Sequence, residues 1–280
     1  MRIEHYKRTS IARAPDEIVR ATNEFTTHHA FLNKDSKPDI YHFHNKRKPG
    51  LDYKPNQIIQ YHSDPGGVDM TFPGTRLTLA QYHCLLAEYR DCKVVRNIIP
   101  IHDPIYTPSY IDLDIIRVGF SPSRTNPQNI KGRFDKGYQV TKIILEKVKN
   151  AFPKRFEYDI ITNTKPVPCM KRKNQCNVVI DEVVTESYHK CTLEGLATGK
   201  ATICSMSEGM EAVLKRYAPW LPVLNVWAKD LEAYLVNMIE SHTDVLKIGI
   251  ASRQWMEQYW RPDDIINNDF IPIYEEIRRR

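Results

Sequence analysis

The chain has 280 residues, of which 41% are hydrophobic and 26% charged, and its formal net charge is +6. This composition is typical of a soluble globular protein and excludes a disordered chain. No apolar run approaches the roughly 18 residues of a membrane span. The opening residues MRIEHYKRTS lack the apolar stretch of a signal peptide, so we expect a cytoplasmic protein. The six cysteines form no CxxC pair, which fits reduced thiols and argues against a zinc framework.

The first third of the chain predicts α/β layering. Residues 15–25 have helical spacing of apolar side chains, with a proline in the first turn. Two strands are predicted at 40–44 and 57–62, each introduced by a Lys-Pro pair. A weaker strand at 77–80 and an extended run at 94–101 follow. Short apolar strands that alternate with helical segments indicate a largely parallel sheet.

A second set of elements begins near residue 115. The predicted strands are 115–120, 158–162, 178–184 and 201–206, and the predicted helices are 138–148, 192–199, 231–239, 253–259 and 271–277. Residues 104–113 contain two prolines and no clear period, which predicts a linker. We therefore predict an N-terminal Rossmann-like domain over 1–110 and a C-terminal one over 111–260. The helix within 261–280 is expected to return to the N-terminal domain.

Two acids stand out in TESYHKCTLEGLATGKATI, residues 185–203, because Glu186 and Glu194 flank the predicted start of a helix. In a parallel crossover, the helix N-terminus lies beside the ligand crevice at the carboxyl end of the preceding strand. Free N–H groups there favour a diphosphate. Glu194 could accept bonds from the vicinal hydroxyls of a sugar or ribose, or could simply complement the helix dipole. Spacing alone leaves both interpretations open.

Residues 178–204 resemble the retaining family 4 glycosyltransferases of the GT-B fold, which carry E-x7-E before a helix of small residues. Ala201 stands where that family often has proline, a packing change that leaves both acids in place. The resemblance implies an α/β GT-B protein with two Rossmann-like domains that face each other across a cleft. It implies that Glu194 holds ribose hydroxyls and that Glu186 meets the donor sugar as a catalytic residue. His189 and Thr192, near the helix start, join the expected donor-binding residues.

The segment VGFSPSRTNPQNIKGRFDKG, residues 118–137, is similar to the family's diphosphate-binding stretch, in which an Arg and the Lys of a KG pair hold the phosphates. Arg124 and Lys136 are the best matches, with Lys131 and Arg133 as rivals, although a basic loop can also be merely solvated. IIQYHSDP resembles the strand end whose histidine approaches the donor sugar. That match gives His62 a catalytic role, against the alternative of a satisfied core residue.

The strand PDIYHFHN resembles the D-V-V-H-x-H strand of the same family and adds further residues to the expected cleft. His42 and His44 share one face of the strand, a spacing compatible with a metal pair. Because no third ligand is apparent and the family is generally metal-independent, we predict no metal site. Asn45 and Ser63 complete the expected cleft residues. In RTSIARAPDEI, Arg13 and its neighbour Ala14 replace the glycine of the family's first loop, and their role is left open.

The resemblance implies transfer of a sugar, with retention, from a nucleotide-diphosphate donor to an acceptor hydroxyl, with no cofactor. The positive charge and compact size favour a hydroxymethylated pyrimidine in duplex DNA, as in bacteriophage DNA modification. The alternatives are a polysaccharide or lipid-linked glycan acceptor, or a non-catalytic protein that binds a nucleotide or nucleic acid. Basic triplets at 46–48, 171–173 and 278–280 could gather phosphates or be solvated. The oligomeric state is not predicted.

Overall fold

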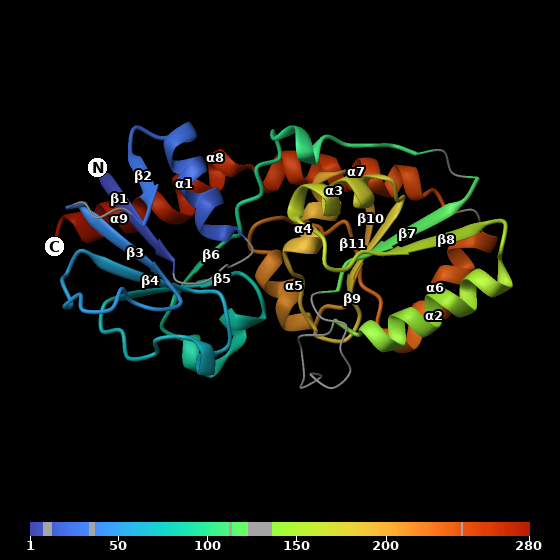
Figure 1. The fold of residues 1–280 in the computed structure, drawn as a ribbon, viewed down its shortest axis with the longest axis horizontal. Coiled ribbons are helices and arrows are strands. Elements are labelled where there is room, and N and C mark those ends of the chain that lie inside the picture. Colours follow the sequence, from blue (N-terminus) through green and yellow to red (C-terminus); the bar gives the residue numbers. More distant parts are fainter. Residues whose placement is uncertain (8–12, 34–36, 112–113, 123–135, 242) are drawn as a thin grey trace. The chain divides into compact units, whose positions relative to one another are not determined.

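A computed structural model describes residues 1–7, 13–33, 37–111, 114–122, 136–241 and 243–280 (Figure 1). The chain divides into two compact units. Unit 1 consists of Met1–Pro100 together with Trp260–Arg280, and unit 2 of Ile101–Tyr259. Each unit contains one parallel sheet, of six strands in unit 1 and five in unit 2. All six cysteines are free. None of the helices in the described ranges is both long and apolar enough to cross a lipid bilayer.

The sheet of unit 1 has the strand order β2-β1-β3-β4-β5-β6, and every pair is parallel. The strands are β1 (Arg2–Lys7), β2 (His29–Leu32), β3 (Ile40–His44), β4 (Gln57–Tyr61), β5 (Thr75–Leu79) and β6 (Lys93–Val95). The strand order reverses direction between β1 and β3. Ligands of such sheets bind beyond the carboxyl ends of the strands at this switch point.

One face of this sheet is covered by helices and the other by loops. The helix α1 (Ala14–Phe25) packs on β2 and contacts the C-terminal elements α8 (Pro262–Ile265) and a π-helical turn, Ile266–Phe270, which continues into α9 (Ile271–Arg278). The links from β4 to β6 contain short 3-10 turns, at Pro65–Gly67, Tyr82–Leu85 and Ala87–Tyr89. The predicted alternation with helices is therefore wrong for these links. An aromatic cluster that includes Phe43, Tyr61 and Phe72 packs beneath them.

The sheet of unit 2 has the order β11-β10-β9-β7-β8, also parallel throughout. Its strands are β7 (Ile116–Phe120), β8 (Phe156–Ile160), β9 (Val178–Glu182), β10 (Ala201–Cys204) and β11 (Val223–Leu224). In order of appearance along the chain this is the arrangement 2-1-3-4-5, whose switch point lies between β7 and β9. Sheet and helices enclose a core of aliphatic side chains from β7, β9, β10, α2 and α6.

Helices cover both faces of this sheet, as an all-parallel sheet requires (Figure 1). On one side α2 (Tyr138–Ala151) packs against α6 (Ala228–Glu240). On the other lie α3 (Pro166–Asn174), α4 (Lys190–Ala197) and α7 (Val245–Tyr259), while α5 (Glu208–Leu214) follows β10. The helix α4 begins two residues before its predicted start and ends before Gly199, whose φ of +70° makes glycine the natural residue after a helix.

The contact between α7 and the turn after α4 leaves no room for a side chain. A Cβ added at Gly249 would lie 2.2 Å from the carbonyl oxygen of Gly199. We expect Gly249→Ala to lower the free energy of unfolding by about 1–3 kcal/mol, because backbone must move to admit the methyl group. Urea unfolding measures this. Gly66→Ala is the matched control, since nothing lies within 4 Å of its added Cβ. Equal unfolding midpoints for the two variants would contradict the packing described.

Candidate functional site

The site in unit 2 lies at the switch point between β7 and β9. Ser121 directly follows β7, Asp181 is the penultimate residue of β9, and the N-terminus of α4 approaches both. The Ser121 Oγ lies 3.3 Å from the Sγ of Cys191, a first-turn residue of α4. The strand–helix–strand unit expected from the sequence is therefore present, and it places α4 where a parallel sheet of this order receives its ligands.

Asp181 is the centre of this site. Its side chain is fully buried, and Oδ1 accepts a bond from Lys136 Nζ at 2.5 Å. Its Oδ2 accepts bonds from the backbone N–H of His189 at 2.7 Å and from the hydroxyl of Thr192 at 2.6 Å. Burial, the largest single cause, raises the pKa of Asp181, but the Lys136 ammonium, the neighbouring His189 and the hydrogen bonds to the carboxylate together outweigh it and hold the pKa well below its usual range. Asp181 is therefore charged throughout the physiological pH range.

Asp181 also changes what the N-terminus of α4 can bind. The backbone N–H groups of His189 and Thr192, at 2.7 and 3.2 Å, both donate to its carboxylate. The expectation that the N–H groups at this helix start are free for a diphosphate is thus wrong for these two. A carboxylate already occupies part of the favourable end of the helix dipole.

A second buried ion pair joins α3 to α4. Lys173 is 2% exposed, and its Nζ lies 2.7 Å from Glu194 Oε2 and 3.2 Å from the Sγ of Cys191. Burial alone would raise the pKa of Glu194, but Lys173 holds it below its usual value, so the carboxylate stays ionised. Glu194 lies in the middle of α4, not in the first turn as predicted. From the sequence, Lys173 belongs to a basic triplet that could gather phosphates or be solvated, but Met170 and Lys173 share the buried face of α3.

Glu182, the last residue of β9, anchors the loop that leads to Glu186. Its Oε2 accepts bonds from the backbone N–H groups of Val184, at 2.8 Å, and Thr185, while its Oε1 accepts the Ser205 hydroxyl at 2.7 Å. Asp181 and Glu182 were not among the predicted site residues. The signal was available, because two acids in the apolar run VVIDEVV need buried partners.

Glu186 is exposed and lies in the left-handed region, with a φ of 65°. Its backbone carbonyl accepts a bond from Ser207 N at 3.0 Å. Within the part of the chain that the structure describes, no side chain hydrogen-bonds its carboxylate. A non-glycine residue at positive φ costs free energy and is held there by its surroundings. The backbone of Glu186 is thus fixed, while its carboxylate is accessible to a ligand.

The expected phosphate-binding residues are only partly described. Arg124, Lys131 and Arg133 lie outside the described residues. The Lys136 side chain is 9% exposed and already paired with Asp181. Arg13, with a φ of 62°, precedes α1, and Ala14 is the first residue of that helix.

In unit 1 the predicted cleft residues lie together at the carboxyl ends of β3 and β4. The Asn45 side chain accepts the His62 N–H at 2.7 Å and donates to the Ser63 hydroxyl at 3.0 Å. His62 Nε2 lies 2.9 Å from His44 Nδ1. Burial, and secondarily the nearby His83, lowers the pKa of His62 to about 3. The imidazole is therefore neutral at physiological pH, so it can form hydrogen bonds but carries no charge.

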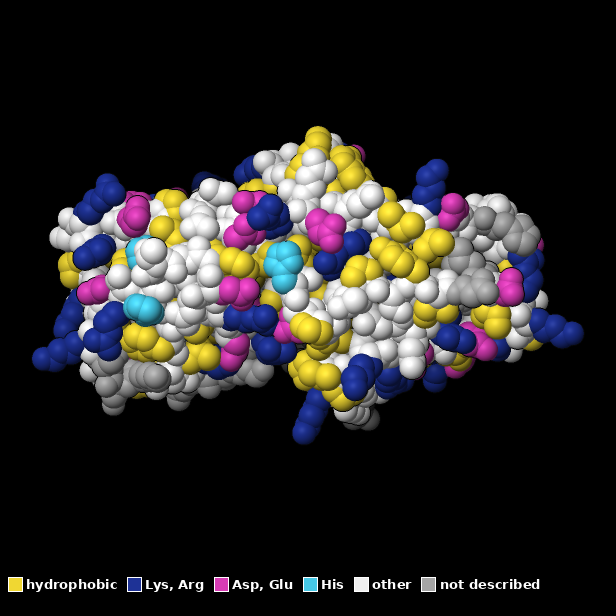
Figure 2. Space-filling model, turned by 90° about the horizontal axis from the view of Figure 1, so that it is seen from above, with side chains coloured by type: hydrophobic (Ala, Val, Ile, Leu, Met, Phe, Trp, Pro, Cys, Tyr) yellow, Lys and Arg dark blue, Asp and Glu magenta, His cyan; other side chains and the backbone are white. Residues whose placement is uncertain are grey.

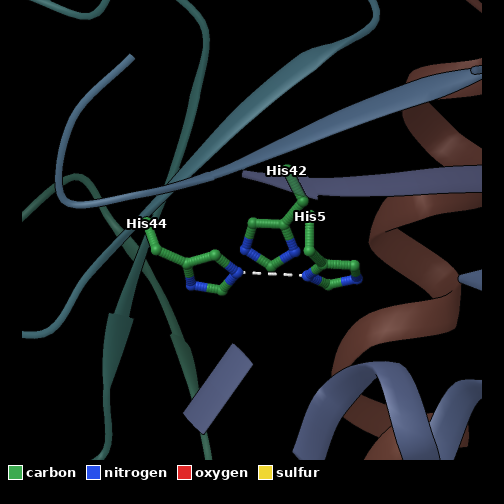
Figure 3. A group of neighbouring side chains, drawn as sticks. All are labelled: His5, His42 and His44. Atoms are coloured by element: carbon green, nitrogen blue, oxygen red, sulfur yellow. Dashed lines mark hydrogen bonds between the residues drawn. The ribbon is translucent and has the colours of Figure 1, made fainter. Parts of the chain in front are cut away.

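A third histidine joins His42 and His44. His5, from β1, pairs with His42 in the strand register, and its Nδ1 lies 3.1 Å from His44 Nε2 (Figure 3). One ligand atom from each ring lies within 4.8 Å of the others, and all three rings are buried. The expectation that no third ligand accompanies the pair is therefore wrong. His5 was missed because RIEHYK does not have the apolar pattern of a buried strand.

The three basic triplets carry less free positive charge than the sequence suggests. More than half of their side chains form ion pairs, and on the face shown in Figure 2 the Lys and Arg side chains are interspersed with Asp and Glu. The pairs are Arg47–Asp69, Arg172–Asp159, Lys173–Glu194, Arg279–Glu275 and Arg280–Glu276.

Several solved structures share the fold of the whole chain. HepE from Anabaena, in complex with UDP and glucose, matches with a TM-score of 0.58 and 11% identity over 100% of both chains. Sucrose-phosphate synthase from Thermosynechococcus elongatus matches with a TM-score of 0.60 and 8% identity over 99% of each chain. MnaA from S. aureus, in complex with UDP, matches with a TM-score of 0.51 and 12% identity over 99% of this chain and 97% of its own. No family model matches the sequence, and no curated protein is significantly similar to it. The predicted GT-B fold class is confirmed.

Acid should destabilise the protein, because His5 cannot be protonated in its buried position. Burial lowers the pKa of His5 to about 3, against 6.5 for an exposed imidazole. Between these values the unfolded chain binds more protons than the folded one, so the free energy of unfolding falls as the pH falls. The fall is about 1.4 kcal/mol per pH unit for each such histidine. Urea unfolding at a series of pH values, with a chelator present so that only protons compete for the rings, measures it.

His5→Gln should reduce this slope by about 1.4 kcal/mol per pH unit, because the other buried histidines still contribute. His102→Gln, which changes an exposed histidine, should leave the slope as it is. An unchanged slope in the His5 variant would show that another group causes the acid sensitivity.

Proposed function

We propose that this chain is a glycosyltransferase that transfers a sugar from a nucleotide-diphosphate donor to an acceptor hydroxyl. The observation that carries the proposal is the cluster at the switch point of unit 2, where Asp181 and Lys173 fix the helix that bears Glu194. Fold similarity over the full length to HepE, whose structures contain UDP or UDP-glucose, supports a uridine nucleotide as donor.

In this proposal Glu194 binds the ribose of the donor. The ion pair with Lys173 uses Oε2 and keeps the carboxylate charged, and Oε1 has no partner among the described residues. Hydrogen bonds to an ionised carboxylate are shorter and about twice as strong as neutral ones. A vicinal diol is the ligand that such an oxygen suits, because it presents two O–H donors side by side. His189 and Thr192 contribute by fixing the start of α4.

Most of the positive charge that neutralises the diphosphate must come from residues outside the buried cluster. Lys136 is balanced by Asp181 and Lys173 by Glu194, so these two pairs leave no excess positive charge. We assign the additional charge to Arg124, with Lys131 and Arg133 as alternatives. Cations aimed at the departing diphosphate would stabilise the charge that grows in the transition state.

Transfer is proposed to proceed with retention, with the acceptor hydroxyl attacking from the side of the leaving group and a phosphate oxygen taking its proton. Glu186 supplies an accessible carboxylate for the donor-sugar hydroxyls, and neutral His62 supplies a hydrogen bond. Both lie at carboxyl ends of parallel strands, Glu186 beyond β9 and His62 beyond β4. A separate catalytic base is not required.

The acceptor we propose is a hydroxymethylated pyrimidine in duplex DNA, with a polysaccharide or lipid-linked glycan as the alternative. The net charge of +6 supports DNA as the acceptor, although acids elsewhere in the chain already pair with several side chains of the basic triplets. Binding to DNA would show a steep salt dependence, because each neutralised phosphate adds about 0.9 to the slope of log K against log salt.

A screen of nucleotide sugars against hydroxymethylated DNA and glycan acceptors, read by mass spectrometry, tests the function. We expect one acceptor class to gain the mass of a hexose or pentose, with release of an equal amount of nucleotide diphosphate. NMR of the product should show an α-linkage when the donor is α-linked. Nucleotide binding without turnover on any acceptor would indicate the non-catalytic alternative. The absence of nucleotide binding would refute the proposal.

Substitution of Glu194 should mainly change UDP affinity, and substitution of Glu186 should mainly change kcat. Glu194→Gln should weaken UDP binding by about 10- to 100-fold, the value of a hydrogen bond to a charged group, as measured by calorimetry. Glu186→Gln should lower kcat by about 100-fold with little change in UDP affinity. Glu208→Gln, an exposed acid on α5, is the control and should change neither.

Glu194→Gln also leaves the Lys173 ammonium unpaired, so a second variant is needed to separate ligand binding from charge balance. The double change Lys173→Met with Glu194→Gln restores neutrality. UDP affinity should stay low in the double variant if Glu194 contacts the ribose. Recovery of affinity would show that Glu194 acts only by balancing Lys173.

A further inference from the structure

The histidine cluster of unit 1 lies where the topology places ligand sites, at the switch point between β1 and β3. His5 and His42 are neighbours across the two strands, and His44 follows His42 on the same face (Figure 3). The three side chains are 0%, 0% and 1% exposed. A cluster of three buried imidazoles is unusual, because most buried polar groups in proteins have their hydrogen bonds satisfied.

Hydrogen bonds among protein groups do not satisfy this cluster. The Nε2 of His5 and the Nε2 of His42 are buried and have no hydrogen-bond partner in the described chain. Leaving such a group unsatisfied is unfavourable, whereas a metal ion would use the free lone pair of His42 Nε2. Burial, the main cause, keeps the pKa of each ring far below 6.5, so the rings are neutral at physiological pH and protons do not compete for their lone pairs.

The outer bonds of two rings match those of metal-binding histidines, whose second nitrogen donates to a fixed partner. His42 Nδ1 lies 2.8 Å from the hydroxyl of Tyr274 on α9, and His44 Nδ1 lies 2.9 Å from His62 Nε2. In both rings the outer bond occupies Nδ1 and leaves Nε2 as the ligand atom. For His5 the ligand atom is Nδ1, which lies 3.1 Å from His44 Nε2. Two nitrogens bound to one tetrahedral zinc at 2.0–2.1 Å lie about 3.3 Å apart.

We propose that His5, His42 and His44 bind one divalent transition-metal ion, and that zinc is the preferred metal. An all-imidazole set suits zinc, copper or nickel and disfavours magnesium and calcium, which take oxygen ligands. Three protein ligands leave a fourth position for water. The ion would join β1 to β3 and, through Tyr274, to α9 at the C-terminus. This ligand set shares no residue with the donor-binding residues proposed in unit 2, although His44 contacts His62, which the proposed function places beside the donor sugar.

The test uses the full chain, freed of any affinity tag and dialysed against a chelator. Titration with zinc against a chromophoric chelator should show one ion per chain. At free zinc 100 times the dissociation constant, the midpoint of thermal unfolding should rise by about 5 °C. His42→Gln should weaken zinc binding at least about 100-fold. His102→Gln, an exposed histidine, is the control and should bind as the unchanged chain does.

Cobalt substitution keeps the proposal testable if the His42 variant does not fold. The unchanged chain with one equivalent of cobalt should show the visible absorption of a tetrahedral nitrogen-rich site, and zinc should abolish it. No binding of either ion by the chain, or equal loss of binding in the His102 variant, would overturn the proposal. The cluster would then be a stack of neutral, hydrogen-bonded imidazoles. UDP binding measured on the same samples reports on unit 2 separately.

Discussion

The geometry of unit 2 depends on one buried carboxylate. Asp181 is completely enclosed, and an ion in such a place is several kcal/mol unfavourable unless partners surround it. Its donors come from separate segments, with Lys136 before α2 and His189 and Thr192 at the start of α4. None of the three can move without leaving the charge uncompensated. The end of β9, the approach to α2 and the first turn of α4 are therefore fixed by a single group.

The sequence predicted this strand–helix–strand unit because its signals are local. The apolar run before Asp181, the helical spacing around Leu193 and the helix end at Gly199 can each be recognised within a few residues. The pairing of Lys173 with Glu194 could not be recognised in this way. It joins two residues that are 21 positions apart and lie on different helices, and α3 contains two prolines and a basic C-terminal turn. The basic triplet at 171–173 thus includes one cation, Lys173, that is buried in the folded protein.

The sequence predicted neither β1 nor β2 in unit 1, and the same limit explains the omission of β1. β1 is paired on both sides, yet RIEHYK buries Glu4 and His5, so it has no apolar alternation to mark it. His42 and His44 were recognised from their spacing in β3, because residues two apart share a face. Their neighbour His5 lies 37 residues before His42 and meets it only through the sheet register. Short-range periodicity identifies a pair of histidines, whereas only the topology can identify three.

Both sheets place polar side chains at their switch points, but the two clusters differ in charge. In unit 2 the buried pairs Lys136–Asp181 and Lys173–Glu194 are ionised and each is balanced, while in unit 1 the buried groups are neutral imidazoles. A balanced cluster can orient a ribose by hydrogen bonds but cannot neutralise the charge that grows on a departing diphosphate. Under the proposed function, the buried residues of α3 and α4 would therefore determine donor affinity. The basic side chains of residues 123–135 would govern turnover, because the buried cluster has no positive charge left to offer.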